Sequence, residues 1–488
     1  FEQDDFYVKA DNFSIDFTQV TRKPHFDCLT SKLRTACPKN VTMTPKQCVK
    51  AFMERNGAVP NLQGIVNQNK VVDHMMDCFI DTYVADKELF STYIFNPVCS
   101  NVDDIEIWLQ GQPPGVWDMV ERADYKNVFD SELRRYNFIL KRMPKPKLVI
   151  GAEYKYPSPQ TIAHHEKNFN ALFCPIIKAL KNRLLAVLKY DKVLNMDMSP
   201  EDLEDLLTVR FPDIDDYKYR VEIDMSKYDK SRESIGWAFG VRMLGLLGFP
   251  LDLLGHWGII QVFTVLHNIL LRFSARVMFQ QKSGSPDTLS TNTVFLLAVL
   301  AMVFNENIEW KNDVRAKEKF LTKKPVYYKS VTRHFYEAPD TNITSRLKNA
   351  IVLAVGDDSY IYSKEYIDVN EITRRLALIF NLEGKILTHK TAYFCSKFLF
   401  NTWDSRFYLV PDFAKVLTKL GRSDLVNEDH VECYRRSLVD NCKAYGNELL
   451  YPYIDLCMQD RYGVKGSYVI YYRALWTFIN DKEAFHKN

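Results

Sequence analysis

The sequence predicts an α+β fold divided into two or three lobes. At 488 residues the chain exceeds the size that one hydrophobic core usually holds together. Residues 219–224 alternate apolar and polar side chains and end on Asp224, as expected of a strand. Residues 351–361 form two apolar runs around a Gly-Asp-Asp-Ser turn, which predicts a β-hairpin. Beyond about residue 400, helical patterning prevails to the end of the chain.

Two earlier segments also predict helices. Residues 168–189 show helical periodicity with a basic face. Residues 285–304 open with Ser-Pro-Asp, so that Ser285 would cap a helix with proline in its first turn. The most apolar run, 294–304, is shorter than the about 20 residues that span a bilayer, and it therefore predicts a buried helix.

The composition is that of an ordinary globular protein, with 47% hydrophobic and 26% charged residues. The net charge is only +3, so any surface for nucleic acid must be a local basic one. None of the ten cysteines falls in a CxxC pair, which argues against a zinc site and favours reduced thiols in a cytosolic setting. The absence of a GxSxG sequence leaves a serine hydrolase without support.

Three aspartates can meet at one edge of the predicted sheet. Asp224 ends the strand, and Asp357 and Asp358 occupy the tip of the hairpin. Because neighbouring strands lie about 4.8 Å apart, carboxylates at their ends can share one or two divalent cations, and magnesium prefers such oxygen ligands. Two ions about 3.5–4 Å apart can activate a hydroxyl and neutralise a leaving pyrophosphate. Taken alone, Gly-Asp-Asp indicates only a polar hairpin turn.

The neighbours of these acids favour the chemical interpretation. Asp229 follows the strand's last aspartate by five positions. On the predicted helix, Thr288 and Asn292 lie four residues apart and share a face, while Gly284 permits close approach of backbone or ribose. Singly, Ser and Thr at a helix start are more often caps than ligands. Together with Ser283, they offer the hydroxyls and the amide that recognition of a ribose 2′-hydroxyl requires.

The order of these motifs resembles that of motifs A, B and C in viral RNA-dependent RNA polymerases. The matching segments are D-x4-D at 224–229, SG-x3-T-x3-NT at 283–293 and GDD at 356–358. Weaker similarities concern motifs D, E and F, at 381–385, 393–399, and 138–147 with 160–173. The forms are most similar to the alphavirus-like supergroup of positive-strand RNA viruses, which includes plant virga- and bromoviruses and related insect viruses. The resemblance runs from about residue 134 to about residue 425.

The resemblance implies roles for the matched residues. Asp224 and Asp357 would bind two Mg²⁺ ions, with Mn²⁺ as an alternative, and Asp358 would be a nearer or outer-shell partner. The ribose of the incoming nucleotide would be read by Asp229, Ser283, Gly284, Thr288 and Asn292. The triphosphate would be held by Lys141, Arg142, Lys145 and Lys147, although a solvated basic face is an equal alternative. Lys385 would protonate the leaving pyrophosphate, although a loop lysine is more often merely exposed.

The implied fold is a right-hand polymerase, with fingers, a palm built on an antiparallel sheet and a helical thumb. The expected parts are an N-terminal extension associated with the fingers and able to bridge them to the thumb (1–130), fingers with the basic motif F (131–190), a palm (191–400) that contains a fingers insertion at about 236–282, and the thumb (401–488).

An apparent insertion at about 305–349 departs from the family pattern. Between residues 319 and 336 it interleaves Lys and Arg with Phe and Tyr and holds no acidic residue. Basic residues among aromatic ones suit a surface for single-stranded RNA, and contact with template or product RNA is therefore predicted. A solvated hairpin whose aromatic side chains pack inward is at least an equal alternative.

The predicted function is template-directed transfer of NMP from NTP to an RNA 3′-hydroxyl by two-metal catalysis, which replicates and transcribes a viral RNA genome. The expected partners are template and product RNA, NTPs and other replicase domains such as a helicase and a capping enzyme. The expected location is the host cytoplasm, in replication complexes that reach membranes through partners.

Two other functions remain open. A reverse transcriptase would exclude the 2′-hydroxyl, typically with a bulky aromatic residue after the first aspartate, whereas here Asp229, Ser283 and Asn292 favour ribonucleotides. An RNA-binding scaffold without chemistry would not need Asp224 and the Asp-Asp pair, which are intact.

Overall fold

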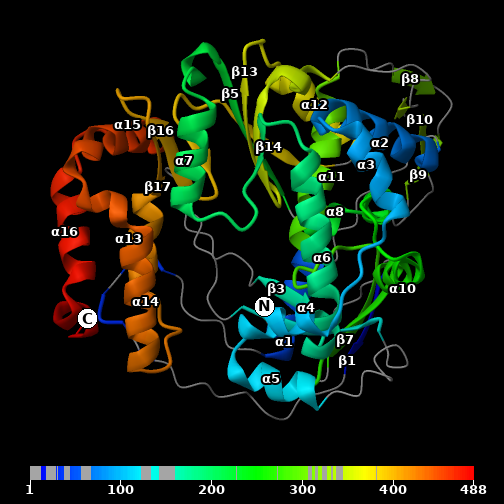
Figure 1. Ribbon diagram of the computed structural model, residues 1–488, viewed down its shortest axis with the longest axis horizontal. Coiled ribbons are helices and arrows are strands. Elements are labelled where there is room, and N and C mark those ends of the chain that lie inside the picture. Colours follow the sequence, from blue (N-terminus) through cyan, green and yellow to red (C-terminus); the bar gives the residue numbers. More distant parts are fainter. Residues whose placement is uncertain are drawn as a thin grey trace.

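The protein is described by a computed structural model, in which the described residues form three larger sheets, one of them central, with helices around them, and two two-stranded sheets (Figure 1). The structure describes residues 13–17, 29, 31–33, 35–37, 44–56, 67–122, 133–141, 160–226, 228–271, 273–305, 310–313, 317–320, 327–330, 333–336, 345–380 and 382–487.

The central sheet has five strands in the order β14-β5-β13-β12-β4. The strands are β4 (Lys192–Leu194), β5 (Tyr219–Met225), β12 (Ile351–Val355), β13 (Asp358–Ser363) and β14 (Gly384–Leu387). The predicted strand and hairpin are thereby confirmed. The predicted antiparallel pairing holds for β14, β5, β13 and β12, but β4 differs because it runs parallel to β12. A long stretch of chain separates these two strands, so no tight turn forces them to be antiparallel.

The two faces of this sheet pack on different cores, because successive side chains of a strand point to opposite sides. One face, which includes Val221 and Ile223, joins the large core against α11 (Thr288–Val303) and α12 (Val369–Phe380). The other face, which includes Tyr360, packs against α7 (Pro200–Arg210) and a second group of strands. Asp224 lies between Ile223 and Met225 and therefore belongs to this second face, at its exposed end.

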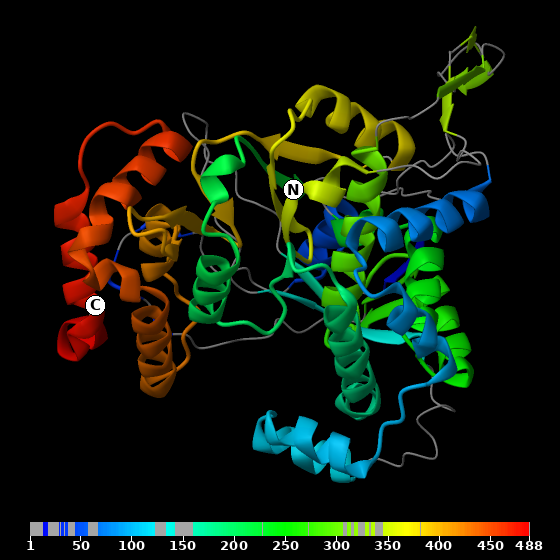
Figure 2. The ribbon, with the colours of Figure 1, turned by 45° about the horizontal axis from the view of Figure 1, so that its top comes forward.

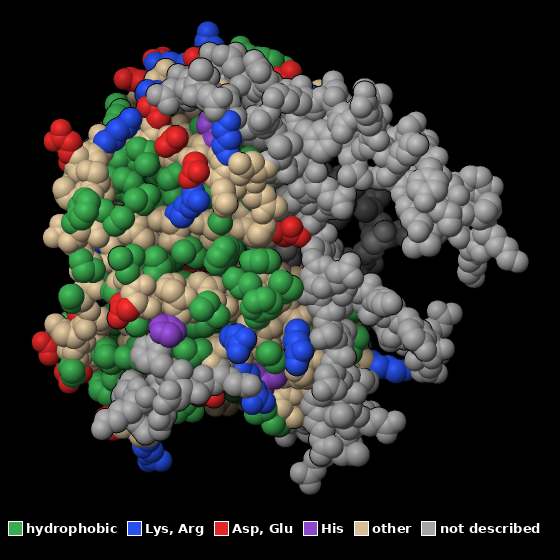
Figure 3. Space-filling model, turned by 90° about the vertical axis from the view of Figure 1, so that its right-hand side faces the viewer, with side chains coloured by type: hydrophobic (Ala, Val, Ile, Leu, Met, Phe, Trp, Pro, Cys, Tyr) green, Lys and Arg blue, Asp and Glu red, His purple; other side chains and the backbone are tan. Residues whose placement is uncertain are grey.

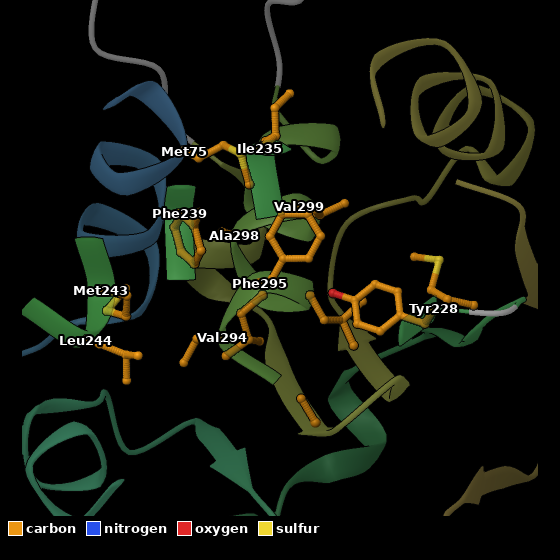
Figure 4. Close-up of a cluster of buried hydrophobic side chains, with 14 of the residues drawn as sticks. Met75, Tyr228, Ile235, Phe239, Met243, Leu244, Val294, Phe295, Ala298 and Val299 are labelled. Carbon is orange, nitrogen blue, oxygen red and sulfur yellow. The ribbon is translucent and has the colours of Figure 1, made fainter. Parts of the chain in front are cut away.

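Helix α11 is buried as predicted, with every residue from Thr291 to Val303 inside the core. It packs against α2 (Gln68–Tyr83) and α9 (Ser234–Leu246), and Figure 4 shows Phe295 of α11 among side chains of both. The predicted start at Ser285 is wrong, since the helix begins at Thr288. Ser285 instead closes turns on both sides, donating from its amide to Lys282 and accepting at its carbonyl from Thr288.

A second five-stranded sheet collects segments from distant parts of the chain, in the order β1-β7-β6-β2-β3. These strands are β1 (Phe13–Phe17), β2 (Arg135–Leu140), β3 (Thr161–His164), β6 (Phe263–Asn268) and β7 (Phe273–Met278). The helices around it include α1 (Pro45–Asn56), α6 (Lys167–Val187), α8 (Tyr228–Ser231) and α10 (Leu251–Val262). The observed α6 confirms the helix predicted at 168–189.

The C-terminal part is mainly helical, as predicted, but begins with a three-stranded sheet. Its strands are β15 (Ala392–Phe394), β16 (Lys397–Asn401) and β17 (Phe407–Pro411). The helices that follow are α13 (Phe413–Leu420), α14 (Glu428–Asn441), α15 (Tyr451–Tyr462), α16 (Val469–Asn480) and α17 (Lys482–Lys487). They form the red and orange body at the left of Figure 1.

The N-terminal part of the chain contacts both ends of the molecule. Strand β1 pairs with β7 of the second sheet. Further along, the Leu29 amide donates to the Leu425 carbonyl at 2.7 Å, and the Thr35 hydroxyl donates to the Thr418 carbonyl at 2.7 Å. The remaining N-terminal helices are α3 (Lys87–Thr92), α4 (Val102–Gln110) and α5 (Pro114–Glu121). These contacts connect the N-terminal part of the chain with the second sheet and with the C-terminal part, and its role as a bridging extension stays a prediction.

The segment predicted as a basic insertion contains two nested antiparallel pairs. Strand β8 (Trp310–Asp313) pairs with β11 (Arg333–Tyr336), and β9 (Lys317–Phe320) pairs with β10 (Tyr327–Ser330). Figure 2 shows these strands at the upper right, projecting from the body. Their side chains lie outside the description, so contact with RNA stays a prediction.

The face that carries α10, at the right of Figure 1, gathers hydrophobic side chains at the surface (Figure 3). On this helix Leu251 and Ile259 are exposed. Across the part of the chain that the structure describes, no helix has both the length and the hydrophobicity needed to cross a membrane.

One ion pair joins the central sheet to the C-terminal helices. Arg461 of α15 donates from Nη1 and Nη2 to the two carboxylate oxygens of Glu222 on β5, at 2.7 and 3.1 Å. Its guanidinium also lies over the ring of Tyr393, 3.3 Å from the centroid. The Arg461 and Glu222 side chains are only 15% and 13% exposed. The pair therefore holds β5, the strand of Asp224, against α15.

We expect Arg461→Met to lower the free energy of unfolding by about 3 kcal/mol, because it leaves the Glu222 carboxylate buried without its cation. Chemical denaturation measures this loss. Arg473→Met is the matched control, since Arg473 pairs with Glu448 at the surface and should contribute less than about 1 kcal/mol. Equal losses in the two variants would contradict the assigned role of the Arg461 pair.

Candidate active site

The register of the central sheet sets three of the predicted residues in one row. Asp224 lies directly opposite Asp358 on β13 and directly opposite Lys385 on β14. Residues directly opposite on antiparallel strands point to the same face, with Cβ atoms about 4.5–5.5 Å apart. Asp224 and Lys385 are exposed and Asp358 is half-buried. The row thus presents two carboxylates and an ammonium on one open part of the sheet.

The hairpin turn that carries Asp357 is anchored to α11. Gly356 has φ of +61°, in the left-handed region that favours glycine. Its amide donates to the hydroxyl of Thr293 at 2.8 Å. Asp357, the next residue, is exposed. The tip of the hairpin is thereby fixed beside α11, which carries other candidate residues.

Two of the predicted ribose-binding residues contact each other. Asn292 donates from Nδ2 to Oδ1 of Asp229 at 2.5 Å, although 62 residues separate them in the chain. Asn292 is 4% exposed and Asp229 is half-buried. The Tyr228 hydroxyl donates to the Asn292 carbonyl at 3.2 Å. The structure therefore brings together Asp229 of the D-x4-D segment and Asn292 of the segment 283–293.

The predicted residues Ser283 and Gly284 lie against β3. The Ser283 hydroxyl donates to the Thr161 carbonyl at 3.2 Å and accepts from the Ala163 amide at 3.4 Å. A Cβ at Gly284 would lie 2.8 Å from Cβ of His164, so glycine allows β3 to approach closely. Both residues hold this loop to β3 in the structure, and their contact with a ribose stays a prediction.

The predicted residue Thr288 also serves the loop before α11. Its hydroxyl donates to the Lys282 carbonyl at 2.6 Å and accepts from Nε2 of Gln281 at 3.3 Å. Gln281 in turn contacts Arg232, the neighbour of Asn292. Thr288 is thus connected to Asn292 through one network, and a direct role at a ribose stays a prediction.

The predicted triphosphate-binding residues fall mostly outside the described chain. Lys141 is exposed just beyond the end of β2, where its amide donates to the Gln160 carbonyl at 2.8 Å. Arg142, Lys145 and Lys147 lie outside the described residues. Phosphate contact by these four cations stays a prediction.

The carboxylates fit a divalent ion by the chemistry of their donor atoms. Asp224 and Asp358 offer hard oxygen donors side by side, and Mg²⁺ typically uses one or two carboxylates together with water and substrate phosphates. Among the residues that the structure describes, no group of three or more His, Cys, Asp or Glu side chains could hold a metal ion. A divalent ion at this place would need further oxygen ligands from water or from substrate phosphates, and metal binding by these aspartates stays a prediction.

Burial keeps two groups beside the aspartates neutral. It raises the pKa of Tyr228 well above its ordinary value, and the nearby Asp357 and Asp229 raise it further against the opposing charge of Arg232. Burial, reinforced by Asp358, raises the pKa of the Cys395 thiol to about 12. Both side chains stay protonated at neutral pH, so neither adds a negative charge beside the aspartates.

Sequence reasoning missed five residues that support the site. All five are buried and lie near the start of α11. They are Arg232, Gln281, Asp287, Thr291 and Thr293. Arg232 is the least expected of them, because charged residues are seldom fully buried. A signal was present in the helical spacing of Gly236 and Gly240, which leaves room beside it.

Comparisons with known proteins agree with the motif order. A family model described as RNA dependent RNA polymerase matches residues 3–312 and 341–488. The match leaves out 313–340, which lies within the predicted insertion.

The similar proteins include viral replicases. The chain is 28% identical over 478 residues to the replicase large subunit of Tobacco rattle virus, covering 98% of this chain and 25% of that protein. The chain is 26% identical over 457 residues to the replicase large subunit of Potato mop-top virus, which covers 93% of this chain and 22% of that protein. The identity to the RNA-directed RNA polymerase of Barley stripe mosaic virus is 28% over 461 residues, which covers 94% of this chain and 53% of that protein.

The chain thus spans between 22% and 53% of the length of these three relatives. The predicted resemblance is confirmed, since the family match covers most of the chain and the relatives are plant-virus replicases. By its motifs, by the meeting of Asp224 with Asp358 and by this match, the chain belongs to the RNA-dependent RNA polymerase family.

Proposed function

We propose that this chain transfers NMP from NTP to the 3′-hydroxyl of an RNA strand, directed by an RNA template, and so replicates and transcribes a viral genome. The observation that carries the proposal is the row of Lys385, Asp224 and Asp358 across the central sheet. Beside the hairpin of this row, Asp229 and Asn292 form a polar contact suited to a ribose. The row supplies the groups for phosphoryl chemistry, and the contact supplies those for substrate choice.

In the proposed reaction the 3′-hydroxyl gives up its proton to solvent, and its oxygen forms a bond to the α-phosphorus of the NTP. The bond from that phosphorus to the oxygen bridging to the β-phosphate breaks, and pyrophosphate leaves. Asp224 and Asp357, with Asp358 beside them, would hold Mg²⁺ or Mn²⁺. Such ions, when bound, lower the pKa of the attacking hydroxyl and neutralise charge on the leaving group. Lys385 would give its proton to the pyrophosphate.

Substrate recognition is assigned to the neighbouring groups. Asp229 and Asn292 would contact the ribose, assisted by Ser283, Gly284 and Thr288. Lys141, Arg142, Lys145 and Lys147 would contact the triphosphate, since guanidinium and ammonium groups suit phosphate oxygens.

The lobes of the structure support a right-hand arrangement. The central sheet with α11 and α12 would be the palm, the second sheet with its helices the fingers, and the helices from α13 onward the thumb. The N-terminal contacts to both β7 and the Thr418 carbonyl suit a bridge from fingers to thumb. The relatives are longer replicases, and we propose helicase and capping domains as partners, in cytoplasmic complexes associated with membranes.

Nucleotide preference and primer extension distinguish the proposed polymerase from two alternatives, a reverse transcriptase and an RNA-binding scaffold. A reverse transcriptase would prefer dNTPs to NTPs on an RNA template, whereas the polar Asp229–Asn292 contact favours NTPs. An RNA-binding scaffold would bind RNA but extend no primer.

We expect Asp224→Asn and Asp357→Asn each to reduce primer extension by about 10³-fold or more, which corresponds to about 4 kcal/mol of barrier. RNA affinity and thermal stability should stay close to those of the parent chain. Extension is measured on a primed RNA template with Mg²⁺ or Mn²⁺, and a chelator should abolish it. Asp205→Asn, an exposed aspartate on α7, is the control. Full activity in either aspartate variant would overturn the proposed function.

We expect Lys385→Leu to lower kcat for nucleotide addition by about 10²-fold, because a proton donor to the leaving group is lost. The KM for NTP should change little. Lys390→Leu, an exposed lysine beyond the end of β14, is the control. Single-turnover incorporation separates the two parameters, and an unchanged rate would remove Lys385 from the mechanism while leaving the aspartates in place.

A further inference from the structure

Arg232 is a buried cation beside the candidate site, and its side chain has no place in the mechanism above. It is 3% exposed, and burying a guanidinium is costly unless acceptors surround it. Its Nη1 lies within hydrogen-bonding distance of Gln281 Oε1 at 2.9 Å, of Thr291 Oγ1 at 3.0 Å and of Asn292 Oδ1 at 3.0 Å. Three side chains from the loop before α11 and from α11 itself thus converge on one nitrogen.

The fold is shaped to receive this side chain. A Cβ at Gly236 would lie 3.2 Å from Nε of Arg232, and a Cβ at Gly240 would lie 3.0 Å from Nη2. The two glycines are four residues apart and so line one side of α9. Nη2 donates to the Gly236 carbonyl at 2.9 Å, and the ring of Phe295 lies 5.2 Å from the guanidinium carbon. The guanidinium therefore occupies a groove along α9 at a defined position.

The position of Arg232 determines how Asn292 is turned. A carboxamide has an accepting end and a donating end, whereas a guanidinium only donates. Arg232 therefore requires Oδ1 of Asn292 to face it, and Nδ2 then faces Asp229, to which it donates. Asp229 restrains one end of the carboxamide, and Arg232 holds the other.

In this orientation Asn292 and Asp229 together offer a ligand one hydrogen-bond donor and one hydrogen-bond acceptor. One N–H of Asn292 is used by Asp229, which leaves its second N–H and the second oxygen of Asp229 for a ligand. A 2′-hydroxyl can accept from the former and donate to the latter, whereas the hydrogen of a 2′-deoxyribose can do neither. Discrimination therefore depends on holding the carboxamide in one orientation.

We propose that Arg232 is a positioning residue that fixes the Asn292 carboxamide against Asp229 and thereby sets the preference for ribonucleotides over 2′-deoxyribonucleotides. The proposal rests on the polymerase function proposed above and goes beyond it, by assigning specificity to a side chain that touches no substrate.

The test compares kcat/KM for an NTP and its matching 2′-dNTP, in single-nucleotide addition to a primed RNA template by the full chain. We expect Arg232→Gln to reduce the ratio of the two values by at least about tenfold, or about 1.4 kcal/mol of discrimination. The loss should come from the NTP, with dNTP addition nearly unchanged. Arg232→Lys and Gly240→Ala should reduce the ratio less, since one retains the charge and the other only displaces Nη2.

A double variant separates positioning from general support of the fold. If Arg232 acts through Asn292, adding Arg232→Gln to Asn292→Ala should lower the ratio no further than Asn292→Ala alone. Tyr83→Phe is the matched control, since it removes another buried hydrogen bond to α11, from the Tyr83 hydroxyl to the Leu297 carbonyl at 2.9 Å. Its ratio should equal that of the parent chain.

An unchanged ratio in Arg232→Gln, or equal losses of NTP and dNTP addition, would overturn the proposal and leave Arg232 a support of the fold. If thermal melting shows that Arg232→Gln does not fold, Gly240→Ala and Arg232→Lys replace it. A lower NTP/dNTP ratio in these variants then supports the proposal, and an unchanged ratio or equal losses of NTP and dNTP addition overturn it. A parent chain that adds no nucleotide would instead contradict the proposed function itself.

Discussion

The antiparallel register between β5 and β13 is the constraint on which the rest of the site depends. It sets Asp224 directly opposite Asp358, and the pairing of β5 with β14 adds Lys385 to the same row. Because side chains alternate along a strand, a slip of one residue would turn Asp224 into the core and Ile223 toward the solvent. Burial of Val221 and Ile223 therefore holds the row of Asp224, Asp358 and Lys385 in place, since the hydrophobic face permits one register.

Helix α11, which packs behind the sheet, positions the residues next to this row. Helix α11 is buried from Thr291 to Val303 and cannot shift without disturbing the large core. From this rigid element Thr293 holds the amide of Gly356 in the hairpin turn, and Asn292 reaches Asp229. The groups proposed for chemistry and those proposed for ribose selection are thus placed by one helix.

Polar contacts at the rim tie the outer parts of the chain to this centre. Arg461 holds the C-terminal helices to β5 through Glu222, while the segment around Thr35 reaches the Thr418 carbonyl at the end of α13. A hydrophobic core between the central sheet and β15–β17 reinforces these contacts, since it holds Leu353 and Tyr360 of the central sheet together with Phe394 and Leu409. The C-terminal helices pack on a further core beyond these strands.

Local patterns were sufficient to predict the elements that carry the chemistry. The strand ending at Asp224, the hairpin around Asp357 and the buried run of α11 depend on alternation, on a turn and on hydrophobicity, which neighbouring residues express by themselves. The ordered motifs identified the family for the same reason. The start of α11 was placed three residues early, because Ser285 closes turns with Lys282 and Thr288 and does not cap the helix.

The sequence by itself determined which residues are acidic, polar or apolar and in which order they follow, and this was enough to identify the family and to select the aspartates proposed for catalysis. Only the tertiary structure decided that β4 runs parallel to β12, that Ser283 bonds to β3, and that Arg232 is buried against Asn292. Each of these joins segments far apart in the chain. Their pairing is decided by the packing of whole elements, since a buried cation is stable only where a groove and several acceptors from separate segments coincide.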